Sequence, residues 1–117
     1  MSKIVIAEDD DAMREFLAQA LSRRGHSVST ASNGAEALRA IEGCDLLLTD
    51  VRMPGVDGVS LARCVASEYP ETAVIFVTGF AHEVRHEPSL DNLKLDVLSK
   101  PFQLNDLVQA VDRMLAA

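Results

Sequence analysis

The fold is decided by a short run, Leu46-Leu47-Leu48-Thr49-Asp50, in which residues suited to a buried strand end abruptly at an acid. Two similar runs flank it along the chain. One is Ile4-Val5-Ile6-Ala7, which four acids follow at once, and the other extends from Ala73 to Thr78. A continuous apolar run without alternation is typical of a strand covered on both faces, as in a parallel sheet. We therefore expect these runs to form the centre of one parallel sheet.

Helical patterns separate these runs. Apolar residues recur at helical spacing from Met13 to Leu21, and Gly25 is a typical helix stop. Asn33 can cap a second helix with Glu36 three residues later. Further helices are expected over Val59–Ser67 and Leu104–Leu115, and short strands over Val28–Thr30 and Val97–Ser99.

Strands thus alternate with helices five times, which predicts an α/β fold with helices on both faces of a parallel sheet. A doubly wound, flavodoxin-like sheet with strand order 2-1-3-4-5 fits five such units. Residues 80–95 are poorly patterned, and Pro88 argues against a long helix there. The length of 117 residues suits a single domain over 1–117.

Composition excludes several classes of function. The net charge is −7 and no basic cluster stands out, so we expect no nucleic-acid binding. No apolar run approaches the roughly 20 residues needed to span a bilayer, and no secretion signal is visible, so we expect no membrane association. Cys44 and Cys64 have neither zinc-ligand nor redox-pair spacing, which favours free thiols in a reducing cytoplasm.

Polar residues follow four of the predicted strands at the point where each strand ends. In open α/β sheets, sites form outside the carboxyl ends of the strands. Mg²⁺ takes oxygen ligands, usually one or two carboxylates, and clustered carboxylates repel one another without a cation. We therefore predict a Mg²⁺ site at this edge, with a hydroxyl and a lysine nearby. The converging residues are Glu8, Asp9, Asp50, Thr78 and Lys100.

Other uses of such acids fit less well. A glycosidase also needs two carboxylates, but its sugar groove usually has aromatic walls, and this chain has one Tyr, four Phe and no Trp. A phosphatase with an aspartate nucleophile expects a second acid two residues after the first, where this chain has Arg52. The glycine-rich phosphate loops of nucleotide-binding proteins are absent.

The segment from Leu46 to Gly58 resembles the phosphoacceptor segment of bacterial two-component response-regulator receiver domains. Glu8-Asp9 is similar to their acidic pair, and Val77-Thr78-Gly79 to their switch threonine segment. Lys100-Pro101-Phe102 is similar to their signature lysine segment. The resemblance covers essentially the whole chain, and all five diagnostic positions are filled.

The resemblance implies a role for each of these positions. Asp50 would accept a phosphoryl group from a phosphohistidine on a histidine kinase or a histidine phosphotransfer protein. Thr78 and Lys100 would bind phosphoryl oxygens, and the bond before Pro101 would be cis. The protein ligands of Mg²⁺ would be Glu8, Asp9, Asp50 and the backbone carbonyl of Arg52. Beyond its own phosphorylation and dephosphorylation we expect no enzyme activity.

Two positions depart from the family pattern. The family usually has an aromatic residue three positions before the lysine, which moves inward with the threonine, and here that position is Val97. The output change must then use another element, for which the 80–95 segment is a candidate. Gly79 stands where the family often has Ala. The smaller residue should open access to the phosphoryl group. Phe80 could shield that group or only pack locally, and Arg52 could affect its lifetime or be an ordinary loop charge.

The chain ends about where a receiver ends, so we expect its output to be a protein contact. It looks most like single-domain receivers that act as adaptors for a ClpX-type unfoldase and its protease in the cell cycle. In those proteins the unphosphorylated form binds the unfoldase. The tail residues Leu115, Ala116 and Ala117 resemble the end of tags read by that unfoldase, or simply finish a helix. The alternatives are a phosphorelay shuttle and a receiver that regulates a kinase or a motor.

Overall fold

The computed structural model describes residues 2–80, 84 and 94–116. Strands and helices alternate from β1 to β4, and most of the segment between β4 and β5 lies outside the described residues. The five strands form one all-parallel sheet in the order β2-β1-β3-β4-β5, as predicted. The strands are β1 (Lys3–Ala7), β2 (Ser27–Ala31), β3 (Leu46–Thr49), β4 (Ala73–Thr78) and β5 (Leu95–Ser99). The helices are α1 (Asp11–Arg23), α2 (Gly34–Ala40), α3 (Gly58–Glu68) and α5 (Leu104–Ala116).

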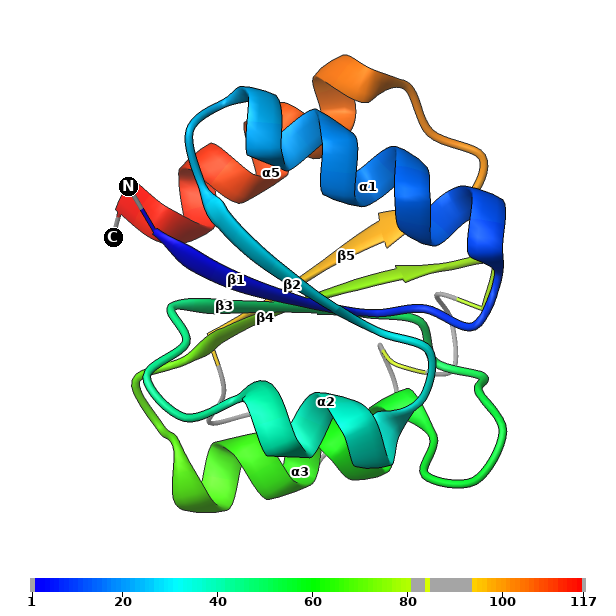
Figure 1. Cartoon of the computed structure of the whole chain (residues 1–117), viewed down its shortest axis with the longest axis vertical. Coiled ribbons are helices and arrows are strands. Elements are labelled where there is room, and N and C mark those ends of the chain that lie inside the picture. The colour runs from blue at the N-terminus through cyan, green and yellow to red at the C-terminus, as the bar shows by residue number, and fades with distance from the viewer. Residues whose placement is uncertain (1, 81–83, 85–93, 117) are drawn as a thin grey trace.

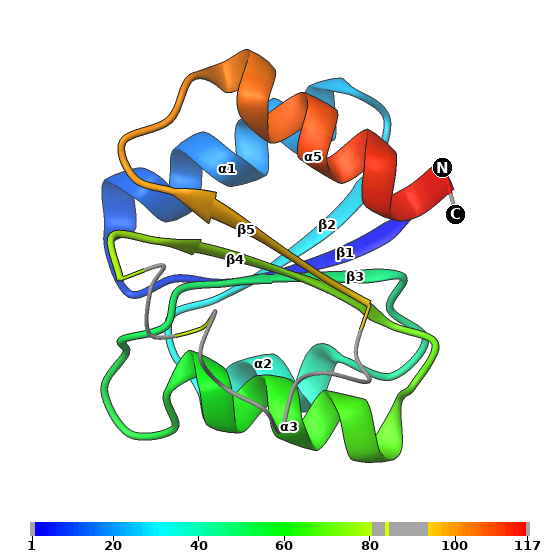
Figure 2. The same cartoon turned by 180° about the vertical axis from the view of Figure 1, so that it is seen from behind.

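The helices form two layers, with α1 and α5 on one face of the sheet and α2 and α3 on the other (Figures 1 and 2). Alternate residues of the buried strands serve the two layers. In β3, Leu47 packs on the α2–α3 side, whereas Leu46 and Leu48 pack on the α1–α5 side. This period-two alternation between two apolar layers explains why the central strands are apolar at every position.

Three helices begin at side chains that cap them. Asp10 accepts a hydrogen bond from the Met13 amide, Asn33 from the Glu36 amide, and Asp57 from the Ser60 amide. The cap at Asn33 was predicted from the sequence. Each cap satisfies an amide that a helix start leaves without a partner.

The observed elements differ little from the predicted ones. The last strand begins at Leu95, two residues before the predicted start, because Leu95 pairs with Val74 at the edge of the sheet. Most of the poorly patterned segment 80–95, the candidate for the output change, lies outside the described residues. Within the residues that are described, no helix has both the length and the apolar character that crossing a membrane would require.

Candidate functional site

The register of the sheet brings the predicted site residues to one edge. Ala7 pairs with Thr49, and Thr78 pairs with Ser99, so the next residue on each of β1, β3 and β5 emerges at the same edge. Those next residues are Glu8, Asp50 and Lys100. The Lys100 amide donates a hydrogen bond to the Thr78 carbonyl at 2.9 Å, which fixes the start of the segment after β5.

The Lys100 ammonium lies between two carboxylates. Its Nζ is 2.9 Å from Glu8 Oε1 and 2.8 Å from Asp50 Oδ2. The side chain of Glu8 is 2% exposed, that of Asp50 12% and that of Lys100 24%. Three charged groups are therefore held together in a largely dehydrated crevice, where hydrogen bonds to ionised groups are strong.

This arrangement shifts two pKa values in the same direction. Burial is the largest influence on Glu8 and raises the pKa of its carboxyl, although hydrogen bonds from Lys100 and the Asp10 amide oppose it. Burial alone would lower the pKa of Lys100. Its hydrogen bonds to Asp50 and Glu8 outweigh burial, so the pKa of Lys100 lies above its ordinary value. Lys100 is therefore a permanent positive charge in this crevice at neutral pH.

The three acids are close enough to share a cation. One carboxylate oxygen each from Glu8, Asp9 and Asp50 lies within 4.8 Å of the others. Both Glu8 oxygens already have partners, because Oε2 accepts a hydrogen bond from the Asp10 amide at 3.1 Å and Oε1 meets Lys100. Asp9 is exposed, and none of the hydrogen bonds or ion pairs of the described residues involves its carboxylate. Asp9 and Asp50 are thus the acids best placed to ligate Mg²⁺ directly, which suits an ion that takes one or two carboxylates.

The loop after β3 holds Asp50 firmly. Asp50 Oδ1 accepts a 2.6 Å hydrogen bond from the Val51 amide and lies 3.4 Å from the Arg52 amide. A Cβ placed on Gly58 would lie 1.9 Å from the Asp50 carbonyl oxygen, and one placed on Gly34 would lie 2.6 Å from the Val56 carbonyl oxygen. The starts of α3 and α2 therefore press against this loop, which requires glycine at both contacts.

The loop after β4 begins differently. The fully buried Thr78 accepts a hydrogen bond from the Phe80 amide at its Oγ1, at 3.0 Å. Phe80 is 39% exposed, and the Arg52 guanidinium lies 4.1 Å from the centroid of its ring. This cation–π contact joins the loop after β3 to the loop after β4 beside the acids. A Cβ on Gly79 would meet no heavy atom within 4 Å.

The remaining predicted positions have the following surroundings. Val97 pairs with the fully buried Phe76 and packs against the α2–α3 side of the core. The Lys100–Pro101 bond is cis, as the resemblance implied. Leu115 packs against the α1–α5 side of the core and Ala116 ends α5, whereas Ala117 lies outside the described residues.

Sequence reasoning missed two kinds of contact at the site. Arg14 donates from its guanidinium to the Glu8 carbonyl at 2.9 Å and pairs with Asp11 at 2.5 Å, which ties the start of α1 to the acidic segment. The close contacts of Gly34 and Gly58 were missed as well. The spacing of Asp57 and Ser60 would have identified the helix start at Gly58, but no local pattern identifies the approach of either glycine to the loop after β3.

Comparison with known proteins agrees with this geometry. A family model described as the response regulator receiver domain matches residues 4–112. The chain belongs to this family. The response regulator receiver protein CpdR of Brucella abortus is 43% identical over 119 residues, which cover 100% of this chain and 99% of the relative. The sensor kinase CckA of the same organism is 35% identical over 116 residues, which cover 96% of this chain but only 12% of the kinase.

Solved receivers share the fold. The response regulator TrrA of Thermotoga maritima, determined in complex with Mg²⁺ and BeF, has a TM-score of 0.87 and 28% identity. That match covers 98% of this chain and 100% of TrrA. The chemotaxis protein CheY4 of Vibrio cholerae has 26% identity and a TM-score of 0.87. That match covers 98% of this chain and 99% of CheY4. The predicted receiver fold is therefore confirmed.

Proposed function

We propose that this chain is a response regulator that accepts a phosphoryl group on Asp50 and signals by a protein contact that depends on it. The observation that carries the proposal is the position of Lys100 between Glu8 and Asp50, with Asp9 beside them. A lysine that neutralises two carboxylates at rest can turn to a phosphoryl oxygen once Asp50 is esterified. Phosphoryl transfer needs placement and charge neutralisation, and this crevice supplies both.

The chain's own residues divide this work. Asp50 Oδ1 is held by backbone amides, and Oδ2 faces Lys100. Attack by the carboxylate on the phosphorus forms an acyl phosphate and releases the donor imidazole of a histidine kinase or histidine phosphotransfer protein. Thr78 can donate its hydroxyl to the new group after giving up the hydrogen bond from the Phe80 amide.

The donor set fits Mg²⁺. Asp9 and Asp50 would hold the ion directly together with the backbone carbonyl of Arg52, and Glu8 would add its charge to the same site. When bound, Mg²⁺ neutralises charge on the phosphoryl oxygens. The carboxylates that repel one another in its absence are a second reason for a cation here.

We further propose that the output is contact with a ClpX-type unfoldase in cell-cycle proteolysis. The support is similarity to CpdR along the full length of both chains. By the resemblance, the unphosphorylated chain would bind the unfoldase and phosphorylation would release it. The protein would then act in the cytoplasm without a catalytic activity toward other substrates.

A pull-down with a purified ClpX-type unfoldase tests the adaptor role. Immobilised wild type and Asp50→Ala are compared with and without Mg²⁺ and a small phosphodonor. We expect wild type to retain the unfoldase only when unphosphorylated, and Asp50→Ala to retain it under both conditions. Equal recovery in every state would remove phosphorylation from the mechanism, and no recovery in any state would remove the adaptor role.

The similarity to part of CckA favours a second candidate, a phosphorelay shuttle. A shuttle returns its phosphoryl group to a histidine, whereas an adaptor keeps it until hydrolysis. Incubating the phosphorylated chain with a purified histidine phosphotransfer protein separates the two. Fast and complete return of the label would favour the shuttle.

The tail is proposed as a degradation signal of the chain itself. Leu115 is packed on the core and Ala116 is helical, so the last turn of α5 would have to unwind before a protease could engage it. Terminal turns unwind at low cost. Replacing Ala116 and Ala117 together by Asp should lengthen the lifetime of the protein in cells, and an unchanged lifetime would contradict the tail hypothesis.

A further inference from the structure

The four consecutive acids after β1 differ in what holds them. Glu8, Asp10 and Asp11 each bond to another group of the chain through their carboxylates. Among the described residues, no hydrogen bond or ion pair involves the carboxylate of Asp9, yet Asp9 is one of the two acids best placed to ligate Mg²⁺. The position of Asp9 is therefore set by the residues on either side of it.

Arg14 contacts both neighbours of Asp9. Its guanidinium Nη1 donates a hydrogen bond to the Glu8 carbonyl at 2.9 Å, and its backbone amide donates to the Asp10 carbonyl at 2.9 Å. The second bond belongs to the helix and needs no particular side chain, whereas the first needs a long side chain that ends in a donor. Because a carbonyl and the following amide share one plane, the first bond fixes the orientation of the peptide that joins Glu8 to Asp9.

The guanidinium also reaches the first residue of α1. Its Nη2 lies 2.5 Å from Asp11 Oδ1, and the side chains of Arg14 and Asp11 are 22% and 90% exposed. An ion pair with one partner in solvent adds little stability, but it holds the guanidinium plane while Nη1 bonds Glu8. Asp11 also offsets the charge of Arg14, so the pair brings little net positive charge to the crevice. A lysine carries one compact ammonium on a flexible stem and lacks this planar fork.

We propose, on the basis of the Mg²⁺ site in the proposed function, that Arg14 is a positioning residue that makes this site selective for Mg²⁺ over Ca²⁺. Mg²⁺ demands near-ideal octahedral geometry with ligands at about 2.1 Å, whereas Ca²⁺ accepts variable geometry at roughly 2.3–2.6 Å. A fixed Glu8–Asp9 peptide restricts where Asp9 presents its oxygens. Loosening that peptide should therefore cost the smaller ion more than the larger one.

The test measures binding of each ion rather than phosphorylation. The full chain labelled with ¹⁵N is titrated with MgCl₂ and, separately, with CaCl₂, and dissociation constants are taken from the amide resonances of Asp9, Asp50 and Val51. Arg14→Met should weaken Mg²⁺ about tenfold, the lower end of the effect of residues that orient metal ligands, and Ca²⁺ less than about twofold. Arg14→Lys keeps the charge but not the fork, and it should lose selectivity in the same way.

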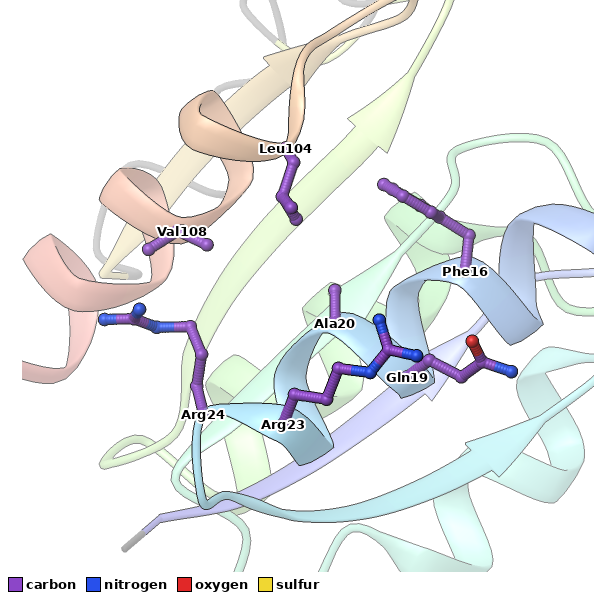
Figure 3. Close-up of a pocket in the computed structure, with 7 residues that line it drawn as sticks. All are labelled: Phe16, Gln19, Ala20, Arg23, Arg24, Leu104 and Val108. Carbon is purple, nitrogen blue, oxygen red and sulfur yellow. The ribbon is translucent and has the colours of Figure 1, made fainter.

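Arg23→Met is the matched control. Arg23 lies in the last turn of α1, beside the groove between α1 and α5 and at the opposite end of that helix from Asp9 (Figure 3). The same chemical change on the same helix should leave both dissociation constants unchanged. Thermal melts in a chelator verify that each variant is folded, and Arg14→Lys supplies the comparison if Arg14→Met does not fold.

Three results would overturn the role of Arg14. Equal weakening of both ions would show that Arg14 supports the crevice without selecting the ion. Tighter Mg²⁺ binding by Arg14→Met would show that its charge opposes the cation, and selectivity fully kept by Arg14→Lys would show that the fork is not needed. If Mg²⁺ shifts none of the three resonances in wild type, the Mg²⁺ site of the proposed function is wrong, and the role of Arg14 with it.

Discussion

The two loops that frame the acidic crevice are built in opposite ways. After β3, glycines at the starts of α2 and α3 press against the loop so closely that an added Cβ would meet backbone oxygens at 2.6 and 1.9 Å. After β4, Gly79 has no heavy atom within 4 Å of such a Cβ, and the Thr78 hydroxyl accepts a hydrogen bond from the Phe80 amide. The first loop is fixed by packing, whereas the second begins with free space around Gly79.

If Asp50 accepts a phosphoryl group, as proposed, this difference gives the two loops different tasks. The acceptor oxygen must be in place before the reaction, and the rigid loop carries Asp50. Thr78 would exchange its hydrogen bond from the Phe80 amide for one to a phosphoryl oxygen, and the free space beside Gly79 would allow this change. Val97 has no aromatic ring that could move with Thr78.

The largest effect should come from replacing one glycine of each loop, Gly58 and Gly79, by alanine. Gly58→Ala forces its methyl group onto the Asp50 carbonyl, so we expect a loss of about 3 kcal/mol of unfolding free energy and much slower phosphorylation. At Gly79 an added methyl group would meet no heavy atom within 4 Å, and φ is not positive. The unfolding free energy of Gly79→Ala should therefore stay within about 0.5 kcal/mol of wild type. Urea unfolding and phosphorylation by a small phosphodonor measure both. Equal effects at the two glycines would contradict the rigid–open comparison.

The next effect concerns the lysine that faces the rigid loop. Lys100→Met removes the charge that neutralises Glu8 and Asp50, and we expect phosphorylation to slow roughly 100-fold, as for the loss of one preorganised donor. Lys3→Met is the matched control, because Lys3 begins β1 at the far end of the sheet and bonds the Glu42 carbonyl. The rate of acyl phosphate formation should be unchanged in that control.

A smaller effect is expected where the two loops meet. If the Arg52–Phe80 contact restricts water at the phosphoryl group, Arg52→Ala and Phe80→Ala should each shorten the phosphoryl lifetime about two- to fivefold. The double variant should decay no faster than the faster single variant, because both remove the same contact. Additive effects would show that the two side chains act independently.

The smallest effect concerns the first turn of α2, which packs against the rigid loop through Gly34 and contains Glu36. Hydrogen bonds from Ser32 to Glu36 lower the pKa of that carboxyl. A lowered pKa in the folded state means that the stabilisation is present above about pH 4.5, the unfolded value, and is lost as the pH falls through the folded value. Wild type and Glu36→Gln should therefore converge in stability in acid, and a difference between them that persists at low pH would contradict this expectation.

Much of this molecule could be predicted from its sequence, and the reason is physical. Strands buried on both faces are apolar at every position, so Leu46–Thr49 and its neighbours identify a parallel sheet, and the residues that follow them locate the site. The contacts of Gly34 and Gly58 could not be predicted, because both depend on the path of the loop after β3, which no periodicity encodes. The ring contact of Phe80 with Arg52 depends on two loop conformations that no periodicity encodes.

The most direct test of the central claim is to locate the phosphoryl group and its metal requirement in one measurement. Wild type and Asp50→Asn are incubated with a small phosphodonor, with Mg²⁺ or with a chelator, and the products are mapped by mass spectrometry. The account predicts one acid-stable, base-labile phosphoryl group on Asp50 of wild type, formed only with Mg²⁺, and none on the variant. Equal modification of the variant, or Mg²⁺-independent labelling of another residue, would contradict it.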